Sequence, residues 1–210
     1  MARDGWMFVG PALIVALLGF ALRAMLGPGW GTVLEVLGLI SAGFFMYFFR
    51  DPQRNSPEEP GTITATADGR IVVVQSRPDG TTQIDTFLSV FNVHVNRAPV
   101  SGTVKSCVHT PGKYHATFKH EAASANERQD LMIESDVGVV ASAQIAGLLA
   151  RRIICRPRPG ERIKQGDGIG MIRFGSRAEV IVPPGFASCV VIGAHVVAGE
   201  TVLARRANHA

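Results

Sequence analysis

The chain has 210 residues, a formal net charge of +4 and a hydrophobic fraction of 47%. This size fits one compact domain plus a membrane segment. The basic residues outside the apolar N-terminus are spread rather than clustered, which favours an anionic membrane surface as a partner and disfavours nucleic acid. Cys107, Cys155 and Cys189 form no Cys-x-x-Cys pair, so we expect small core residues in a reducing compartment and neither a disulfide framework nor a zinc site.

Two apolar stretches open the chain, from Gly5 to Leu22 and from Trp30 to Phe49, with a turn at Gly27-Pro28-Gly29 between them. Each is close to the roughly 20 residues that a helix needs to cross a bilayer. Pro11 interrupts the first stretch and Glu35 the second, so two spans, a re-entrant hairpin and an interfacial helix pair all remain open. A cleaved signal peptide is disfavoured because the first stretch lacks a strongly basic start and a clear cleavage site.

The residues that flank the second stretch predict an orientation. Arg50, Arg54 and Arg70 follow it and favour the cytoplasmic side of the inner membrane for the rest of the chain. Aromatic residues suited to the membrane interface are Trp6, Trp30, Tyr47 and Phe48. We therefore predict a membrane-associated helical segment over residues 1–54 and a cytoplasmic domain over residues 55–210.

A polar linker from Asn55 to Gly61 marks the start of the second domain, which reads as mainly β. Short β-branched segments bounded by Gly, Pro or Asp predict strands at 62–67, 70–75, 100–108, 131–135, 137–145 and 180–182. No long amphipathic helix is needed.

An internal repeat occupies the C-terminal third of the chain. Residues 160–169 and 193–202 share the pattern Gly-x-x-aliphatic-x-x-Gly-acid-x-aliphatic. Such hairpins resemble those of biotinyl and lipoyl carrier folds, so we expect a barrel-sandwich-like domain in which each Gly supplies a turn with positive φ. The repeat also raises an alternative function, a non-enzymatic membrane-anchored adaptor or carrier domain, although the Met-Lys-Met turn of biotin carriers is missing.

Gly175-Ser176 is the most informative dipeptide for the chemistry of this chain. An isolated Gly-Ser is usually an ordinary turn. However, Gly175 removes side-chain bulk and tolerates unusual backbone geometry, so the Ser176 hydroxyl can reach the Gly175 carbonyl. Such an attack can cut the chain and leave a pyruvoyl group.

Five separated motifs in a fixed order strengthen that interpretation. They are Phe48-Phe49-Arg50-Asp51-Pro52-Gln53-Arg54, Ala67-Asp68-Gly69, Phe91-Asn92-Val93-His94-Val95-Asn96-Arg97-Ala98-Pro99, Asn126-Glu127-Arg128 and Arg173-Phe174-Gly175-Ser176-Arg177. Together they resemble the short bacterial form of the phosphatidylserine decarboxylase proenzymes, from about residue 45 to near the C-terminus. The apolar N-terminus also resembles the membrane-associated start of that family.

The resemblance implies an enzyme that decarboxylates phosphatidylserine to phosphatidylethanolamine. Self-cleavage at Gly175-Ser176 would give a β chain, residues 1–175, and an α chain, residues 176–210, held together as a heterodimer that can assemble further. Ser176 would become the pyruvoyl group and form a Schiff base with the substrate. Neither a metal nor pyridoxal phosphate would be required.

The assisting residues are predicted from residue type and from the same resemblance. His94 is the first choice for general acid or base, because histidine titrates near neutral pH and a strand over 92–96 would put Asn92, His94 and Asn96 on one face. Long-form relatives carry an Asp-His-Ser relay. Asp68 and Ser176 match its outer members, while the relay histidine falls near Arg97 here, three positions after His94.

The substrate contacts are predicted from weaker signals. The resemblance places substrate-facing residues near His115 and His120, and the separation of these two does not match a helical metal pair, so we predict no metal. Arg97 and Arg128 are candidates for the substrate phosphate or carboxylate, because a guanidinium pairs with such groups through two hydrogen bonds.

Overall fold

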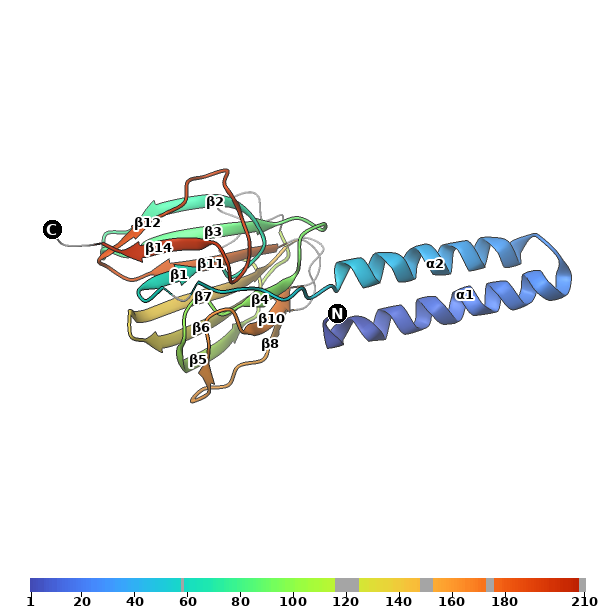
Figure 1. The fold of residues 1–210 in the computed structure, drawn as a ribbon, viewed down its shortest axis with the longest axis horizontal. Coiled ribbons are helices and arrows are strands. Elements are labelled where there is room, and N and C mark those ends of the chain that lie inside the picture. Colours follow the sequence, from blue (N-terminus) through green and yellow to red (C-terminus); the bar gives the residue numbers. More distant parts are fainter. Residues whose placement is uncertain (58, 116–124, 148–152, 173–175, 208–210) are drawn as a thin grey trace. The chain divides into compact units, whose positions relative to one another are not determined.

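A computed structural model describes residues 1–57, 59–115, 125–147, 153–172 and 176–207. The chain forms two compact units, Met1–Pro52 and Gln53–Ala210, the first helical and the second built of β-strands (Figure 1). The first unit ends at Pro52, so Arg54, which we expected in the first segment, belongs to the second unit. Its guanidinium pairs there with Asp68 at 2.8 Å.

The elements follow the chain in this order. The helices are η1 (a 3-10 helix, Arg3–Gly5), α1 (Trp6–Leu26) and α2 (Trp30–Phe48); the strands are β1 (Thr62–Thr64), β2 (Gly69–Ser76), β3 (Thr82–Leu88), β4 (Val95–Arg97), β5 (Gly102–Thr110), β6 (Arg128–Ser135), β7 (Gly138–Ala146), β8 (Ile153–Cys155), β9 (Arg162–Ile163), β10 (Gly168–Ile172), β11 (Ser176–Val182), β12 (Phe186–Ser188), β13 (His195–Val196) and β14 (Val202–Arg206).

Helices α1 and α2 form an antiparallel pair, and by length and composition both are able to cross a membrane. Pro11 and Glu35 lie inside the helices and end neither of them, contrary to the expected interruptions. Pro11 lies near the start of α1, where it removes only one backbone hydrogen bond. Glu35 is neutralised by Arg23, whose Nε donates to its carboxylate at 2.7 Å.

Small residues let the two helix backbones approach closely. A Cβ atom added to Gly38 would lie 2.5 Å from the backbone nitrogen of Ala16 and 2.8 Å from the carbonyl oxygen of Ala12. Close contact through small residues is the usual packing of membrane helices, for which lipid provides no hydrophobic drive to associate. The large apolar side chains are therefore left mostly on the outer faces of the pair.

The aromatic residues expected at a membrane interface divide into two groups. Trp6, Trp30 and Tyr47 are exposed, as an interfacial position requires. Phe48 is fully buried and packs edge-on against Phe49, with ring centroids 5.0 Å apart, so the interfacial assignment of Phe48 was wrong.

The second unit contains one large sheet and two small ones. The eight-stranded antiparallel sheet has the order β13-β2-β3-β11-β7-β6-β5-β9, and the three-stranded sheets have the orders β1-β14-β12 and β4-β10-β8 (Figure 1). In the described part of the chain these sheets do not close into a barrel. Buried aliphatic side chains of all three sheets, among them Ile63, Ile84, Ile133 and Ile169, form one core. The expected fold, mainly β with two apolar N-terminal helices, is confirmed.

The repeat seen in the sequence belongs to a larger structural duplication, and each half of the β unit contains one copy of it. The amides of Gly160 and Gly166 donate to the carbonyls of Val104 and Ala98, and those of Gly193 and Gly199 donate in the same way to Ile71 and Ala65. All four glycines have φ between 74° and 92°, which a residue with a side chain rarely adopts. The expected positive-φ turns are thus confirmed.

The sheet order is symmetric about the β11–β7 pair. Hairpin β2–β3 lies beside β11 as hairpin β5–β6 lies beside β7, and the short strands β13 and β9 form the two edges. One half is the continuous run from β4 to β10. The other half consists of β1–β3 and β11–β14, on either side of that run. Ser176 therefore lies at the point where the chain leaves one half and re-enters the other.

The predicted strands have the right places but not always the right lengths. Strand β1 ends at Thr64 rather than at residue 67, and the short segment expected at 180–182 is the end of the longer strand β11. Strand β3 was not predicted because Thr82–Leu88 carries Gln83 and Asp85, which read as loop residues. Both are buried and bound to each other, with Gln83 Nε2 donating to Asp85 Oδ1 at 2.9 Å.

Candidate active site

Ser176 is the first residue of β11 and pairs with Leu88 of β3 on one side and Ala146 of β7 on the other. It is fully buried, and its Oγ has no hydrogen-bond partner among the described residues. A buried hydroxyl without a partner costs about 1–3 kcal/mol, so it usually has a functional reason. Gly175 lies outside the described residues.

His94 lies beside the strand that leads to this serine. Val95 of β4 pairs with Met171 of β10, so the continued register puts His94 opposite the end of β10. His94 is fully buried, and its Nδ1 lies 2.9 Å from the carbonyl oxygen of Asn92. Because a carbonyl only accepts, Nδ1 carries the hydrogen, and the neutral imidazole has its basic lone pair on Nε2.

The expected strand over 92–96 is shorter than predicted, since β4 begins at Val95. Asn92 lies in the preceding turn, where its Oδ1 accepts from the amide and the hydroxyl of Ser89 at 2.9 and 2.8 Å. It does not share a strand face with His94. The turn was missed because period-2 alternation continues through it by chance.

A buried polar network that sequence reasoning missed lies on the Ser176 face of the large sheet. Gln144 of β7 is opposite Ala178, which faces the same way as Ser176. The Gln144 Nε2 donates to Asn96 Oδ1 at 2.7 Å, and Ser142 Oγ lies 3.4 Å from Thr66 Oγ1. The alternation of Ser142 and Gln144 with alanines was the signal that marks a polar inner face.

Asp68 is bound by two groups that belong to neither His94 nor Ser176. Its Oδ2 accepts from Arg54 Nη2 and its Oδ1 from the Ala198 amide, both at 2.8 Å. In the other half of the duplication, Ser101 accepts from the Gln165 amide at 2.9 Å at the equivalent place. One Asp68 oxygen thus accepts a turn hydrogen bond that has an equivalent in the other half. Its part in a relay stays a prediction.

His115 is held close to the Ser176 strand pair by Asn126. The Asn126 side chain is 2% exposed, accepts from the His115 amide and donates to the carbonyls of His115 and Ala146, each at 2.8 Å. Ala146 is the β7 partner of Ser176. His120, the other histidine predicted to face substrate, lies outside the described residues.

The two candidate arginines have different surroundings. The Nη1 of Arg97 donates to the carbonyl of Gly166 at 2.9 Å. Arg128 pairs with Asp130 at 2.6 Å and with Glu179 at 3.0 Å. Burial lowers the pKa of Arg128, but the hydrogen bond that it donates to Asp130 and the charges of Glu179 and Asp130 outweigh the effect of burial and raise the pKa.

The sheet register also separates Arg128 from the serine. Arg128 is opposite Ile145, and Ile145 is opposite Arg177, so Arg128 and Arg177 share a face. Ser176 precedes Arg177 in the strand and therefore faces the other side. The charge of Arg128 is balanced by a network on that second face, which also contains the ion pair of Arg177 with Asp85 at 3.1 Å.

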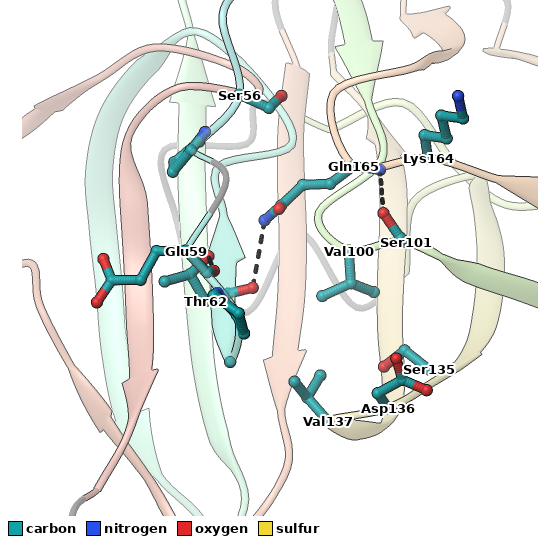
Figure 2. A pocket seen from close by; sticks show the side chains of 13 residues that line it. Ser56, Glu59, Thr62, Val100, Ser101, Ser135, Asp136, Val137, Lys164 and Gln165 are labelled. Atoms are coloured by element: carbon teal, nitrogen blue, oxygen red, sulfur yellow. Dashed lines mark hydrogen bonds between the residues drawn. The ribbon is translucent and has the colours of Figure 1, made fainter.

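A pocket of about 610 Å³ lies away from Ser176. Its lining includes Asp136, in the turn that begins β7, whereas Ser176 pairs with Ala146 at the opposite end of that strand. Inside it, the Gln165 side chain reaches to the Thr62 carbonyl at 3.2 Å (Figure 2). No cluster of three or more metal-binding side chains occurs among the described residues.

Comparison with known proteins connects this arrangement to a reaction. The profile of the family described as phosphatidylserine decarboxylase matches residues 41–204. Proteins named phosphatidylserine decarboxylase proenzyme are 41% identical in Nitratidesulfovibrio vulgaris, covering 93% of this chain and 92% of the relative, and 40% identical in Burkholderia cenocepacia, covering 97% and 95%. A relative of that name in Chlorobaculum parvum is 40% identical and covers 84% of both chains. The chain therefore belongs to the phosphatidylserine decarboxylase family of carboxy-lyases, whose members are named as proenzymes.

Proposed function

We propose that this decarboxylase activates itself by cutting the Gly175–Ser176 bond and converting Ser176 into a pyruvoyl group. The observation that carries the proposal is the position of Ser176. It is the first residue of β11, its hydroxyl is buried without a hydrogen bond among the described residues, and it lies at the junction between the two halves of the duplication. Backbone strands on both sides hold the residue in place.

The cleavage begins when Ser176 Oγ attacks the Gly175 carbonyl carbon. The peptide C–N bond breaks, and an ester links the two parts. Elimination then breaks the bond from Oγ to Cβ, which releases Gly175 as a carboxylate and leaves dehydroalanine at position 176. Addition of water and loss of ammonia give the pyruvoyl group.

The pyruvoyl carbonyl supplies an electron sink, which takes up the substrate amine and accepts the electron pair released as carbon dioxide leaves. It requires no metal and no pyridoxal phosphate. The buried site suits this chemistry, because exclusion of water strengthens interactions with developing charge.

His94 acts as general acid and base. Its Nδ1 is fixed by the Asn92 carbonyl, so protons move at Nε2. It takes the proton of the Ser176 hydroxyl during cleavage and gives a proton to the substrate carbon after carbon dioxide has left. To act as the outer member of a relay, the Asp68 carboxylate must release Arg54 and contact the site instead.

The substrate-facing residues are His115 and His120, with Arg97 and Arg128 as partners for phosphate or carboxylate. Support is strongest for His115, which Asn126 ties to the strand beside Ser176. Arg128 has the least support, because two carboxylates already neutralise it on the opposite face of the sheet.

The functional unit is a heterodimer of the chains 1–175 and 176–210, anchored at the inner membrane with the β unit in the cytoplasm. Strand β11 of the smaller chain lies between β3 and β7, and β14 pairs with β1, so cleavage leaves both sets of backbone hydrogen bonds intact. The two apolar helices and the basic residues Arg50, Arg54 and Arg70 support the anchor and its orientation.

Mass measurement of the full chain purified in detergent tests the proposal. Under denaturing conditions we expect two polypeptides, 1–175 and 176–210, the smaller blocked at its N-terminus and reactive toward hydroxylamine. Under native conditions the two should stay together. The variant Ser176→Ala should remain one chain and lose decarboxylation.

The matched control is Ser188→Ala, because Ser188 is an exposed serine of the same C-terminal part. It should be cut and active like the unmodified protein. An unmodified chain that decarboxylates phosphatidylserine while uncut would overturn the proposal. An uncut chain without activity would favour the adaptor alternative.

A further inference from the structure

Cys107 and Cys155 lie far apart in the sequence and adjacent in the fold. Cys107 belongs to β5 of the large sheet and Cys155 to β8 at the edge of the sheet β4-β10-β8. Their Sγ atoms are 2.9 Å apart. The two strands share no backbone pairing, so the sulfurs meet through side-chain packing between the two sheets.

The surroundings favour a bond between these two thiols over other reactions. Both cysteines are partly buried, and Gln129 Nε2 lies 3.2 Å from the Cys107 Sγ, which fixes the direction of that sulfur. Cys189 is exposed and free. A disulfide has a length of about 2.05 Å, so the two sulfur atoms need to approach each other by roughly 0.9 Å to form one.

We propose that Cys107 and Cys155 are a modification site, at which a disulfide oxidant of the glutathione type closes an intramolecular disulfide. One cysteine thiolate attacks the oxidant, forms a mixed disulfide and expels one glutathione thiolate. The second cysteine then attacks the protein sulfur of the mixed disulfide and expels the second glutathione. Two electrons pass from the cysteines to the oxidant, and the two thiol protons end on the two glutathione molecules.

The same surroundings lower the reactivity of the Cys155 thiol. Burial, and then the hydrogen bond and charge of Cys107, raise the pKa of the Cys155 thiol far above its usual range. Because the thiolate is the nucleophile, Cys155 reacts slowly by itself.

The crosslink would act on the strands that lead to Ser176. Strand β8 pairs with β10 through Cys155 and Gly170, and β10 is the last described strand before Ser176. The bond would tie this small sheet to β5 of the large sheet. Both cysteines precede Ser176, so the crosslink lies within one chain after cleavage and does not join the two products.

Thiol counting on the full-length protein tests the inference. The protein in detergent is incubated with oxidised glutathione or with dithiothreitol, then denatured, alkylated with N-ethylmaleimide and analysed by intact mass and peptide mapping. The reduced protein should take up three alkyl groups. The oxidised protein should take up one, on Cys189, and yield a peptide that contains Cys107 bonded to Cys155.

Four variants make the result specific. Cys189→Ser should lose two alkylatable thiols on oxidation and keep the crosslink, whereas Cys107→Ser and Cys155→Ser should not form it. Ser176→Ala should crosslink normally, so failure of the self-cleavage proposal would not affect this one. Three alkylated cysteines after oxidation, stable glutathione adducts without the internal bond, or a bond that involves Cys189 would each overturn the inference.

Discussion

Ser176 is a buried polar residue whose position does not satisfy its hydroxyl within the described part of the chain. Its hydroxyl has no hydrogen bond among the described residues, whereas nearby polar side chains are bound in pairs. The two histidines of the candidate site also differ in how they are held. His94 is fixed through its own ring by the Asn92 carbonyl, whereas His115 is fixed through its backbone by the side chain of Asn126.

We expect Asn126 to position His115. Replacing Asn126 by Ala removes three hydrogen bonds and should destabilise the protein by about 2–4 kcal/mol, at roughly 1 kcal/mol for each bond. If His115 contacts substrate, Asn126→Ala, His115→Ala and the double variant should lower decarboxylation by similar factors, because the residues act as a unit. Chemical denaturation and a double-mutant cycle on activity measure both effects.

The control for this prediction is Asn92→Ala, since Asn92 also accepts hydrogen bonds from a neighbouring turn residue but is not linked to His115. It should show additive effects when combined with His115→Ala. Additive effects of Asn126→Ala and His115→Ala would show that Asn126 stabilises the fold and does not position His115.

At the scale of elements, the two parts of the chain use glycine for different reasons. In the β unit, glycines with positive φ make the turns of the repeat. In the helical unit, glycines remove side chains so that α1 and α2 can touch. The first use follows from backbone conformation and the second from packing, where the small buried residues Ala12 and Ala16 of α1 and Gly38 and Ala42 of α2 are each four positions apart.

Substitution at Gly38 should open the helix pair. A Cβ there would overlap the α1 backbone at Ala16 and Ala12, which cannot move without separating the helices. We expect Gly38→Ala to accelerate amide hydrogen exchange in peptides from both helices, measured on the full chain in detergent micelles. Gly43→Ala in the same helix adds a Cβ that meets nothing within 4 Å and should leave exchange unchanged or slower. Equal exchange in the two variants would contradict the close packing.

At the scale of the whole molecule, the duplication would allow the chain to stay assembled after the proposed cut at Gly175–Ser176. The half that contains Ser176 is made of two sequence segments, β1–β3 and β11–β14, which already meet through sheet pairing. A cut before Ser176 would fall at the start of β11 and would leave the described strands of both halves whole.

The proposed orientation in the membrane can be measured with Cys189, an exposed thiol of the β unit. A membrane-impermeant maleimide should label it in inverted inner-membrane vesicles and leave it unlabelled in intact spheroplasts. The variant Cys189→Ser should lose the rapid labelling in inverted vesicles, which identifies the reacting residue. Labelling of Cys189 in intact spheroplasts would place the β unit on the other side of the membrane.

Local pattern alone was sufficient for several features of this protein. Long apolar runs predicted the two helices, because burial of apolar side chains in lipid depends on composition and length. The Gly spacing predicted the turns of the repeat, because a positive φ is a property of one residue. The ordered motifs, including Gly175-Ser176 and His94, predicted the family.

Only the tertiary structure decided which residues meet. The contact of Cys107 with Cys155, the link from Asn126 to Ala146 and the engagement of Asp68 by Arg54 all join segments that the sequence keeps apart. The strand β3 could not be predicted because its polar residues are buried by partners on other strands. Such contacts depend on sheet register, which the whole core sets at once, and this is why no single segment encodes them.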